Sequence, residues 1–337
     1  MGDMPRQGRL DASGLLHHVL ARGVAGGRIF RDDPDRAHFL RNFAALIREA
    51  DARCLAWALM PTHLHLLIRT GRRPLTWLMH RLLLRHAQWV NHRWRRPGHL
   101  FQNRYKAILV DEEPYLLRLV RYIHRNPLDA RLVPSLAALS RYQWCGHRSL
   151  LGIRPVAWQA VDEVLERFSR HRPAARRAYL AWMAEGNPEG EEPILEGGGL
   201  VRNAGGWEAM AAGGRDRQPR AGDQRILGDG EFVGRVLREV EHQDRRREGL
   251  RRRLAPRDVV RRAAEAMEVP EEAVYGRMRH RATSEARALA SYWLRDELGM
   301  RSADVARLLN VTSPAVSVAV PRGRKLAEAR KLSLDKG

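Results

Sequence analysis

The sequence places two histidines one residue apart, His63 and His65, inside the apolar stretch 57–68. In a β-strand alternate side chains share a face, so both imidazoles would point one way and Leu64 and Leu66 the other. Two neighbouring imidazoles on a strand with a buried opposite face can hold a divalent metal ion. The alternative is a pair of polar side chains on the solvated face of an amphipathic strand.

A second group of candidate residues, Tyr122 and Asn126, lies in the predicted helix 112–126. Residues four apart share a helix face, so Asn126 can give the metal an oxygen ligand while Tyr122 reaches a phosphate held by that metal. A free tyrosine has a pKa of about 10 and is a poor nucleophile at neutral pH. A metal can act on it as Lewis acid and template. The product would be a phosphotyrosine link that stores the energy of the broken phosphodiester, so rejoining would need no ATP.

Two alternatives stay open for the tyrosine. Tyr122 could be a core aromatic of an amphipathic helix. Tyr115 is a rival nucleophile, because a step of seven residues returns to nearly the same helix face. The spacing of four residues to Asn126 favours Tyr122.

The elements that must position these residues follow from hydrophobic periodicity and turn signals. Pro127 should end the last helix, because the residue before a proline is disfavoured in helical geometry. This order predicts a small α+β domain with an antiparallel sheet covered by helices. The pattern predicts strands at 14–24, 54–60, 62–69 and 105–110 and helices at 32–50, 74–94 and 112–126.

The rest of the chain divides by composition into further segments. The predicted domains are a catalytic domain at 10–155, a helical extension at 156–185, a Gly-rich linker at 186–230 and an all-α DNA-binding domain at 231–337. Within the last, two short helices at about 302–320 have the pattern of a helix-turn-helix, with Ser302 and Ser313 as N-caps and Pro321 ending the second helix.

The charge of the chain indicates a polyanionic partner. Sixty Lys and Arg against 39 Asp and Glu give a formal net charge of +21, and nucleic acid is the first expectation for so basic a protein. The predicted DNA contacts beside the catalytic site are Arg95, Arg96, Arg104 and Lys106, and those in the C-terminal domain are Ser313, Ser317, Arg322, Arg324 and Lys325.

Cysteine content and hydropathy indicate the cellular compartment in which the protein is expected. Two isolated cysteines, Cys54 and Cys145, give neither a disulfide framework nor a cysteine-based zinc site. Neither a signal peptide nor an apolar run long enough to cross a bilayer is expected. We therefore expect a cytoplasmic, nucleoid-associated protein without a membrane partner.

The stretches 57–67 and 115–127 together resemble the single-tyrosine His-hydrophobic-His (HUH) transposases of the IS200-like group. They are most similar to the branch associated with repetitive extragenic palindromes (REP), over about residues 10–155. Residues 301–320 weakly resemble the DNA-binding domain of the bacterial replication initiator. The resemblance implies a ferredoxin-like HUH nuclease fold with a Mg²⁺ or Mn²⁺ ion. It also implies cleavage of single-stranded DNA near hairpins, with a 5′-phosphotyrosine intermediate and a free 3′-hydroxyl.

By position, the resemblance assigns the metal ligands to His63, His65 and Asn126 and the nucleophile to Tyr122. Some relatives have glutamine where this chain has Asn126, which shortens the side chain by one carbon. The expected function is a metal-dependent, ATP-independent transposase and single-strand endonuclease, acting as a monomer or homodimer. The alternatives are a DNA-binding transcriptional regulator derived from an inactive transposase and a metal-dependent RNA-processing nuclease. Duplex DNA is a further expected partner, through the C-terminal domain.

Overall fold

The computed structural model describes residues 14–186, 223, 225–275 and 280–334. Tertiary contacts divide the chain into two units, Met1–Arg235 and Val236–Gly337. The predicted start of the C-terminal domain at 231 lies close to this division, which falls inside helix α11 (Gly230–Arg253). Each unit is described by itself.

The N-terminal unit is built around an antiparallel sheet. Along the chain its first elements are β1 (Leu16–Arg22), α1 (Asp33–Ala50), β2 (Arg53–Leu59) and β3 (His63–Arg69). Helix α2 (Leu75–Arg93) and strand β4 (Lys106–Val110) follow. The strands lie in the order β2-β3-β1-β4, and each neighbouring pair is antiparallel. The βαββαβ order with β1 and β3 in the centre is the ferredoxin-like arrangement, so the predicted α+β fold is confirmed. The first strand is shorter than predicted, because residues Val24–Gly26 form a short 3₁₀ turn.

A fifth strand corrects the predicted linker. Strand β5 (Ile226–Leu227) pairs in parallel with Leu109 and Val110 of β4, and both of its residues are fully buried. Two apolar residues are enough to cover a sheet edge that would otherwise be open. The many glycines around them led to the prediction of a linker instead of a strand. Most of the predicted linker at 186–230 lies outside the described residues.

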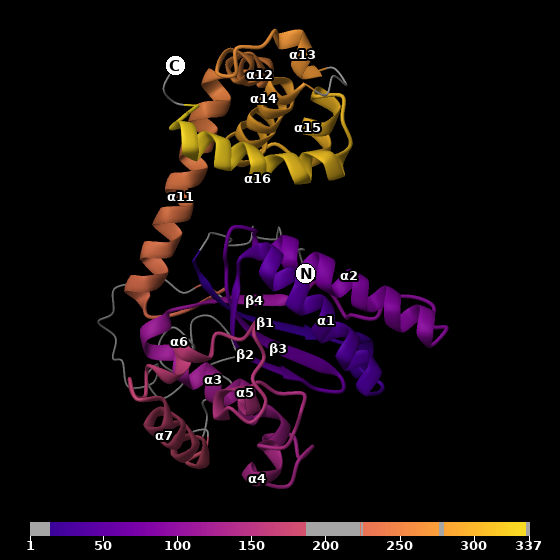
Figure 1. Ribbon diagram of the computed structural model, residues 1–337, viewed down its shortest axis with the longest axis vertical. Coiled ribbons are helices and arrows are strands. Elements are labelled where there is room, and N and C mark those ends of the chain that lie inside the picture. Colours follow the sequence, from indigo (N-terminus) through magenta and orange to yellow (C-terminus); the bar gives the residue numbers. More distant parts are fainter. Residues whose placement is uncertain (1–13, 187–222, 224, 276–279, 335–337) are drawn as a thin grey trace, which may run out of the picture. The chain divides into compact units, whose positions relative to one another are not determined.

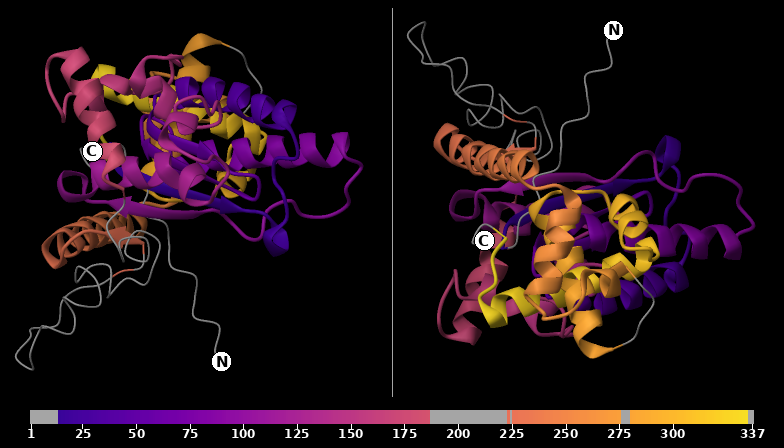
Figure 2. Two further views of the ribbon diagram at one scale, coloured as in Figure 1. Left: turned by 90° about the horizontal axis from the view of Figure 1, so that it is seen from below. Right: turned by 90° about the horizontal axis from the view of Figure 1, so that it is seen from above.

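Helices cover both faces of this sheet, and Figures 1 and 2 show α1 and α2 side by side on one of them. Leu64 and Leu66 of β3 pack there with Phe39 and Phe43 of α1. The opposite face is covered by α3 (Glu112–Asp129), backed by shorter helices. These are α4 (Leu136–Leu139), α5 (His147–Leu151), α6 (Val161–Leu165) and α7 (Arg172–Ala184).

The predicted end of α3 at Asn126 is wrong. The helix continues through the buried Pro127 to Asp129. The chain then closes with Ala130 N–H donating to the Asn126 carbonyl and Leu132 N–H to the Pro127 carbonyl. Burial of the last helical turn against the sheet outweighs the local preference of the residue before a proline.

The C-terminal unit is all-helical, as predicted. It contains most of α11, then α12 (Pro256–Glu265), α13 (Glu271–Tyr275), α14 (Arg281–Tyr292), a π-helical segment (Trp293–Glu297), α15 (Ser302–Leu308) and α16 (Ser313–Arg330). Its core includes Val259, Leu289, Trp293, Val316 and Val320.

Three details of the predicted helix pair at 302–320 need correction. The N-caps are Arg301 and Thr312, and the Thr312 side chain accepts from Ala315 N–H. Helix α16 also runs through Pro321 to Arg330. Its packing on α14 explains this: a Cβ at Gly323 would clash with the carbonyl oxygen of Ala288, so the two backbones touch there. Tertiary burial thus overrides the proline. Over the part of the chain that the structure describes, no helix is both long and apolar enough to cross a membrane.

Candidate active site

The two histidines lie on the sheet face covered by α3. His65 is fully buried and His63 is half-buried, with ring centroids 5.1 Å apart. Register brings β1 beside them, with Leu20 opposite His65 and Arg22 opposite His63. His18, on the same face of β1, is also buried.

His18 is the direct neighbour of His65 in this site. His18 Nε2 lies 3.0 Å from His65 Nδ1, and the two rings stack at 5.3 Å. A histidine that binds a metal through Nε2 usually donates its Nδ1–H to a partner that fixes the ring. His18 occupies that partner's position.

Helix α3 runs antiparallel to β3, and contacts at both ends fix its register. At its start, Arg69 Nη1 donates to Glu112 at 2.8 Å. Near its end, His63 Nε2 and Asn126 Oδ1 are 3.3 Å apart. From residue 112 to 126 a helix rises about 21 Å, and from residue 69 to 63 a strand spans about 20 Å. The two elements therefore match in length.

The same register places Tyr122 over His65. The phenol ring contacts His65 and His18 edge-on, at centroid distances of 5.5 and 6.0 Å. Tyr122 is 3% exposed and belongs to the core, so it packs as a core aromatic while its ring lies beside the histidines. Tyr115 lies two turns earlier, about 10 Å along the helix axis.

The donor set fits a divalent ion. Burial, together with the positive charges of nearby groups, holds the pKa of His65 well below its usual value, so the ring stays neutral and keeps a lone pair for a metal. Among the described residues no three His, Cys, Asp or Glu side chains form a metal-binding group. The amide oxygen of Asn126 lies 3.3 Å from His63 Nε2, so it is an oxygen donor available beside the two histidines.

The outer side of α3 is clamped to α7 rather than presented to solvent. The Arg121 guanidinium lies 4.1 Å above the Trp182 ring, and Arg125 donates to the Met183 carbonyl at 2.7 Å. Further inside, the Tyr179 hydroxyl lies 2.9 Å from His124 Nδ1 and 2.7 Å from His147 Nδ1.

Burial lowers the pKa of both histidines, that of His147 to about 4, so this network is uncharged at neutral pH. It fixes the helix that carries Tyr122.

Cationic side chains line a pocket on the same sheet face. Arg22, Arg104 and Lys106 surround a cavity of about 260 Å³ together with Leu20, Gln102 and Asn103. Since Arg22 is paired with His63 across the strands, this cavity adjoins the histidines. Of the predicted DNA contacts, Arg104 and Lys106 thus lie beside the site. Arg95 is exposed in the loop that follows α2, and Arg96 lines a different pocket.

The family described as "Transposase IS200 like" matches residues 13–126. This range includes His63, His65, Tyr122 and Asn126. The similarity to the IS200-like transposases therefore extends over about a third of the chain. Among solved structures the chain is similar to one described as "Structure of the REP associates tyrosine transposase bound to a REP hairpin". The match has 15% identity and a TM-score of 0.37, and covers 47% of this chain and 92% of that one. No curated protein matches the chain.

Sequence reasoning missed two residues of the candidate site, His18 and Arg22. Both were visible as alternate residues of the predicted first strand, on the face opposite Val19 and Ala21. Their relation to the His63 pair depends on β1 lying next to β3, which the order of elements along the chain does not specify.

The contacts predicted in the C-terminal unit lie on helix α16 but do not share one surface. Arg324 is committed to an ion pair with Asp296, and the Ser317 hydroxyl donates to the Ser313 carbonyl. Two of the predicted contacts, Arg322 and Lys325, do lie on the exposed stripe of this helix, together with Ala315 and Val318.

Proposed function

We propose that the transposase domain cleaves and rejoins single-stranded DNA near hairpins through Tyr122. The observation that carries the proposal is the arrangement on α3. One helix holds the phenol ring against His65 and the Asn126 amide against His63. This arrangement supports Tyr122 as the nucleophile, because its ring and the Asn126 amide both lie beside the histidines of one strand.

In the proposed step, the Tyr122 oxygen attacks a DNA phosphorus atom and the bond from phosphorus to the 3′ oxygen breaks. The phenol proton leaves to solvent and the departing oxygen takes up a proton, which yields a 5′-phosphotyrosine and a free 3′-hydroxyl. One phosphoester replaces another, so a 3′-hydroxyl can reverse the step without ATP.

His63, His65 and Asn126 would hold a Mg²⁺ or Mn²⁺ ion, which when bound supplies Lewis acidity at the phosphate oxygens. The chain's own contribution is positional. His18 orients His65, and the contact of Arg69 with Glu112 sets the register of α3. Arg104 and Lys106 lie where they can bind neighbouring phosphates.

The tyrosine acts within its own chain in this proposal, because α3 lies over the histidines of the same chain. A monomer therefore contains the complete set of residues. A mixture of Tyr122→Phe and His63→Ala proteins should then form no covalent adduct. Adduct formation in the mixture would show that partner chains exchange their tyrosines.

The central test is covalent trapping with a labelled hairpin oligonucleotide whose single-stranded flanks come from the DNA adjoining the gene. With Mg²⁺ or Mn²⁺, the wild-type protein and Tyr115→Phe should form a protein–DNA adduct, whereas Tyr122→Phe should not. His63→Ala and His65→Ala should lose metal-dependent cleavage. An adduct in Tyr122→Phe, or full activity in either histidine variant, would contradict the proposal.

The C-terminal unit supports a second role, binding of duplex DNA. Ala315 and Val318 come first on the exposed stripe of α16 and suit apolar contact with thymine methyl groups, while Arg322 and Lys325 suit phosphates. Duplex and hairpin binding without any adduct would favour the regulator derived from an inactive transposase. Turnover of RNA without covalent trapping would favour the RNA-processing nuclease.

A further inference from the structure

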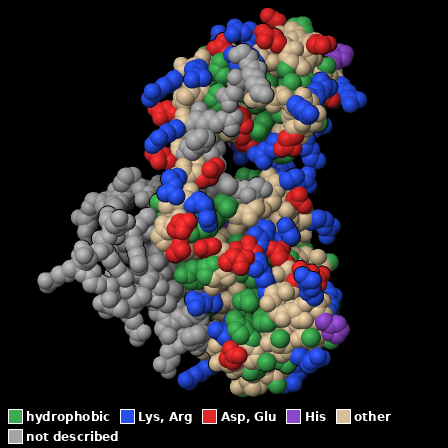
Figure 3. Space-filling model, turned by 90° about the vertical axis from the view of Figure 1, so that its left-hand side faces the viewer, with side chains coloured by type: hydrophobic (Ala, Val, Ile, Leu, Met, Phe, Trp, Pro, Cys, Tyr) green, Lys and Arg blue, Asp and Glu red, His purple; other side chains and the backbone are tan. Residues whose placement is uncertain are grey.

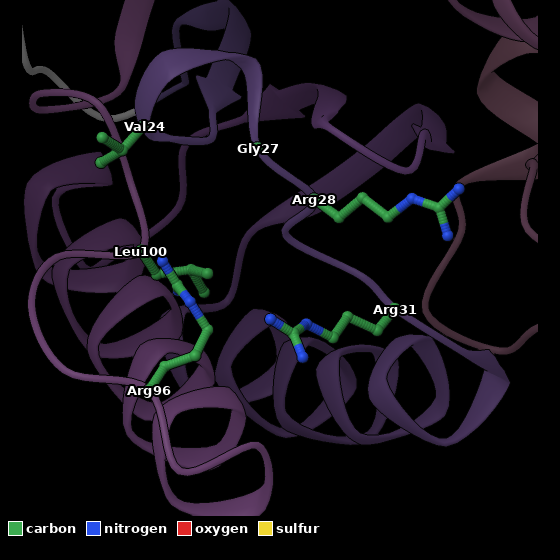
Figure 4. A pocket seen from close by; sticks show the side chains of 6 residues that line it. All are labelled: Val24, Gly27, Arg28, Arg31, Arg96 and Leu100. Carbon is green, nitrogen blue, oxygen red and sulfur yellow. The ribbon is translucent and has the colours of Figure 1, made fainter.

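A second cationic pocket lies outside the site described above. It has a volume of about 450 Å³ and is formed by the loop that follows β1 and the loop that follows α2. Figure 4 shows Arg31 extending across the pocket toward the side chain of Arg96, which lies beside Leu100, while Arg28 extends away from both. Its lining residues are Val24, Gly27, Arg28, Arg31, Arg96 and Leu100.

The guanidinium groups of Arg31 and Arg96 contact neutral groups, while the Arg31 backbone N–H donates to Asp35 at 3.0 Å. Arg31 lies 5.0 Å from the centre of the Trp94 ring, and Arg96 donates to the Asn91 amide oxygen at 3.4 Å. Within the described ranges, no carboxylate forms an ion pair with Arg28, Arg31 or Arg96. Two guanidinium groups that line one pocket without a counter-charge repel each other, so an anion in the pocket would be stabilised.

The nearest carboxylates cannot supply that anion. Asp32 and Asp35 bind Arg93, at 2.6 and 2.7 Å. Asp35 also accepts from the indole N–H groups of Trp89 and Trp94, at 3.2 and 3.1 Å. The protein therefore neutralises Arg93 internally and leaves Arg31 and Arg96 for a ligand.

In the described part of the chain, carboxylates pair with Arg93 but not with the guanidinium groups of the pocket. On the face shown in Figure 3, Lys and Arg side chains are scattered among acidic ones rather than gathered into one patch. The guanidinium groups of this pocket contact neutral groups, which distinguishes the pocket from the mixed charges on that face.

The shape and lining of the pocket indicate the chemistry of the ligand. Val24 and Leu100 give it an apolar wall beside the guanidinium groups. The two non-bridging oxygens of a phosphodiester carry its negative charge and can accept two hydrogen bonds from one guanidinium group, and the attached deoxyribose has an apolar side that suits the wall. Nucleic acid is therefore a better fit than a carboxylate side chain.

The pocket is tied directly to the catalytic strand. Gly23 N–H donates to the Thr62 carbonyl at 2.9 Å, and Ile29 N–H donates to the Pro61 carbonyl at 2.8 Å. The next residue after Thr62 is His63. On the other side, Val24 N–H donates to the Leu100 carbonyl, so both pocket loops are joined to each other and to the residues just before the start of β3.

We propose that Arg31 and Arg96, with Arg28 at the rim, bind one phosphodiester of the DNA strand at a position outside the cleaved bond. The proposal rests on the proposed function in taking single-stranded DNA as the ligand. The pocket then fixes the strand at a second point, and the distance between the two points sets which bond reaches Tyr122.

The experiment measures binding rather than cleavage, with Tyr122→Phe protein and the hairpin oligonucleotide described above. Each linkage of the flanks is replaced in turn by an uncharged methylphosphonate. At one linkage outside the scissile bond the replacement should weaken binding about tenfold, close to 1.4 kcal/mol. In the background of Arg31→Ala with Arg96→Ala, the same replacement should change binding less than twofold. The salt dependence of that variant should also fall by about 0.7 in logarithmic slope, as for one phosphate contact.

Two controls separate the pocket from general charge and from folding. Arg41→Ala with Arg48→Ala removes the same charge from exposed positions of α1 and should leave the methylphosphonate effect in place. Arg31→Lys with Arg96→Lys keeps the charge and should give an intermediate effect.

If no linkage shows this coupling, the pocket does not bind the strand and the proposal is wrong. Binding of inorganic phosphate that depends on Arg31 and Arg96, without any coupled linkage, would equally overturn it in favour of a free anion. Failure of wild-type protein to form an adduct would refute the proposed function separately, because the coupling is measured without cleavage.

Discussion

Replacement of His18 tests whether the histidine pair is a metal site whose geometry comes from β1. His18→Leu removes the partner of His65 Nδ1, 3.0 Å away in a fully buried position. A buried polar group left without its partner costs about 1–3 kcal/mol. Loss of a residue that orients a metal-binding histidine typically costs 10- to 100-fold in metal affinity. We therefore expect the Kd for Mn²⁺ to rise by about that factor.

The assay is titration of the DNA-free protein with Mn²⁺, with free ion detected by electron paramagnetic resonance. The free energy of unfolding is measured in parallel by urea denaturation. His17→Leu is the matched control, because His17 is equally buried on the same strand but belongs to the opposite face of the sheet. It should lower stability without changing the Kd.

A rescue variant makes the reasoning sharper. In His18→Gln the terminal amide lies near the position of the lost Nε2 and can accept the His65 Nδ1–H bond, so Mn²⁺ affinity should return most of the way. An unchanged Kd in His18→Leu would refute the orienting role. An equal rise in Kd for the His17 and His18 variants would show that the effect comes from destabilisation of the sheet.

Three further predictions concern stability and duplex binding. The pKa of His86 is lowered to about 4 by burial, so the unfolded chain binds a proton below pH 6.5 that the fold excludes until pH 4. Between pH 7 and pH 4 the wild type should therefore lose about 3 kcal/mol more unfolding free energy than His86→Leu in urea titrations, and equal losses would contradict this cause. Gly323→Ala should destabilise the C-terminal unit by about 1–3 kcal/mol. Gly249→Ala should not, because a Cβ at that position meets no other atom. Equal melting temperatures of the two variants would contradict this prediction. Val318→Asp should weaken duplex binding in fluorescence anisotropy at least tenfold and spare adduct formation. Ala329→Asp makes the same charge change near the C-terminal end of α16 and should affect neither.

The local pattern of the sequence was enough to predict the βαββαβ order and the alternation that puts His63 and His65 on one face. The shared face of Tyr122 and Asn126 also followed from helical spacing, and the structure confirms their proximity to the histidines. Their chemical roles stay predictions. His18 and Arg22 could not be selected, because their place beside β3 depends on strand order rather than on their own neighbours.

The errors at the prolines have one physical cause. Pro127 and Pro321 both lie in helices whose burial against other elements outweighs the local cost of a missing N–H. The same reasoning accounts for β5, where Ile226 and Leu227 gain a partner only after the sheet has formed. Long-range packing is the information that periodicity lacks.

Strand β5 has a consequence for how the catalytic unit is made. The edge of β4 is covered by residues that the ribosome adds only after α3, α7 and the following segment have been synthesised. Until then the nascent sheet offers open backbone groups at that edge, which are a site for pairing with other chains. A fragment that ends near residue 185 would keep the whole candidate site and still be prone to aggregate, whereas a fragment that extends past Leu227 would cover the edge of β4 itself. Recombinant work on the catalytic unit should therefore choose its boundary by this strand and not by the last catalytic residue.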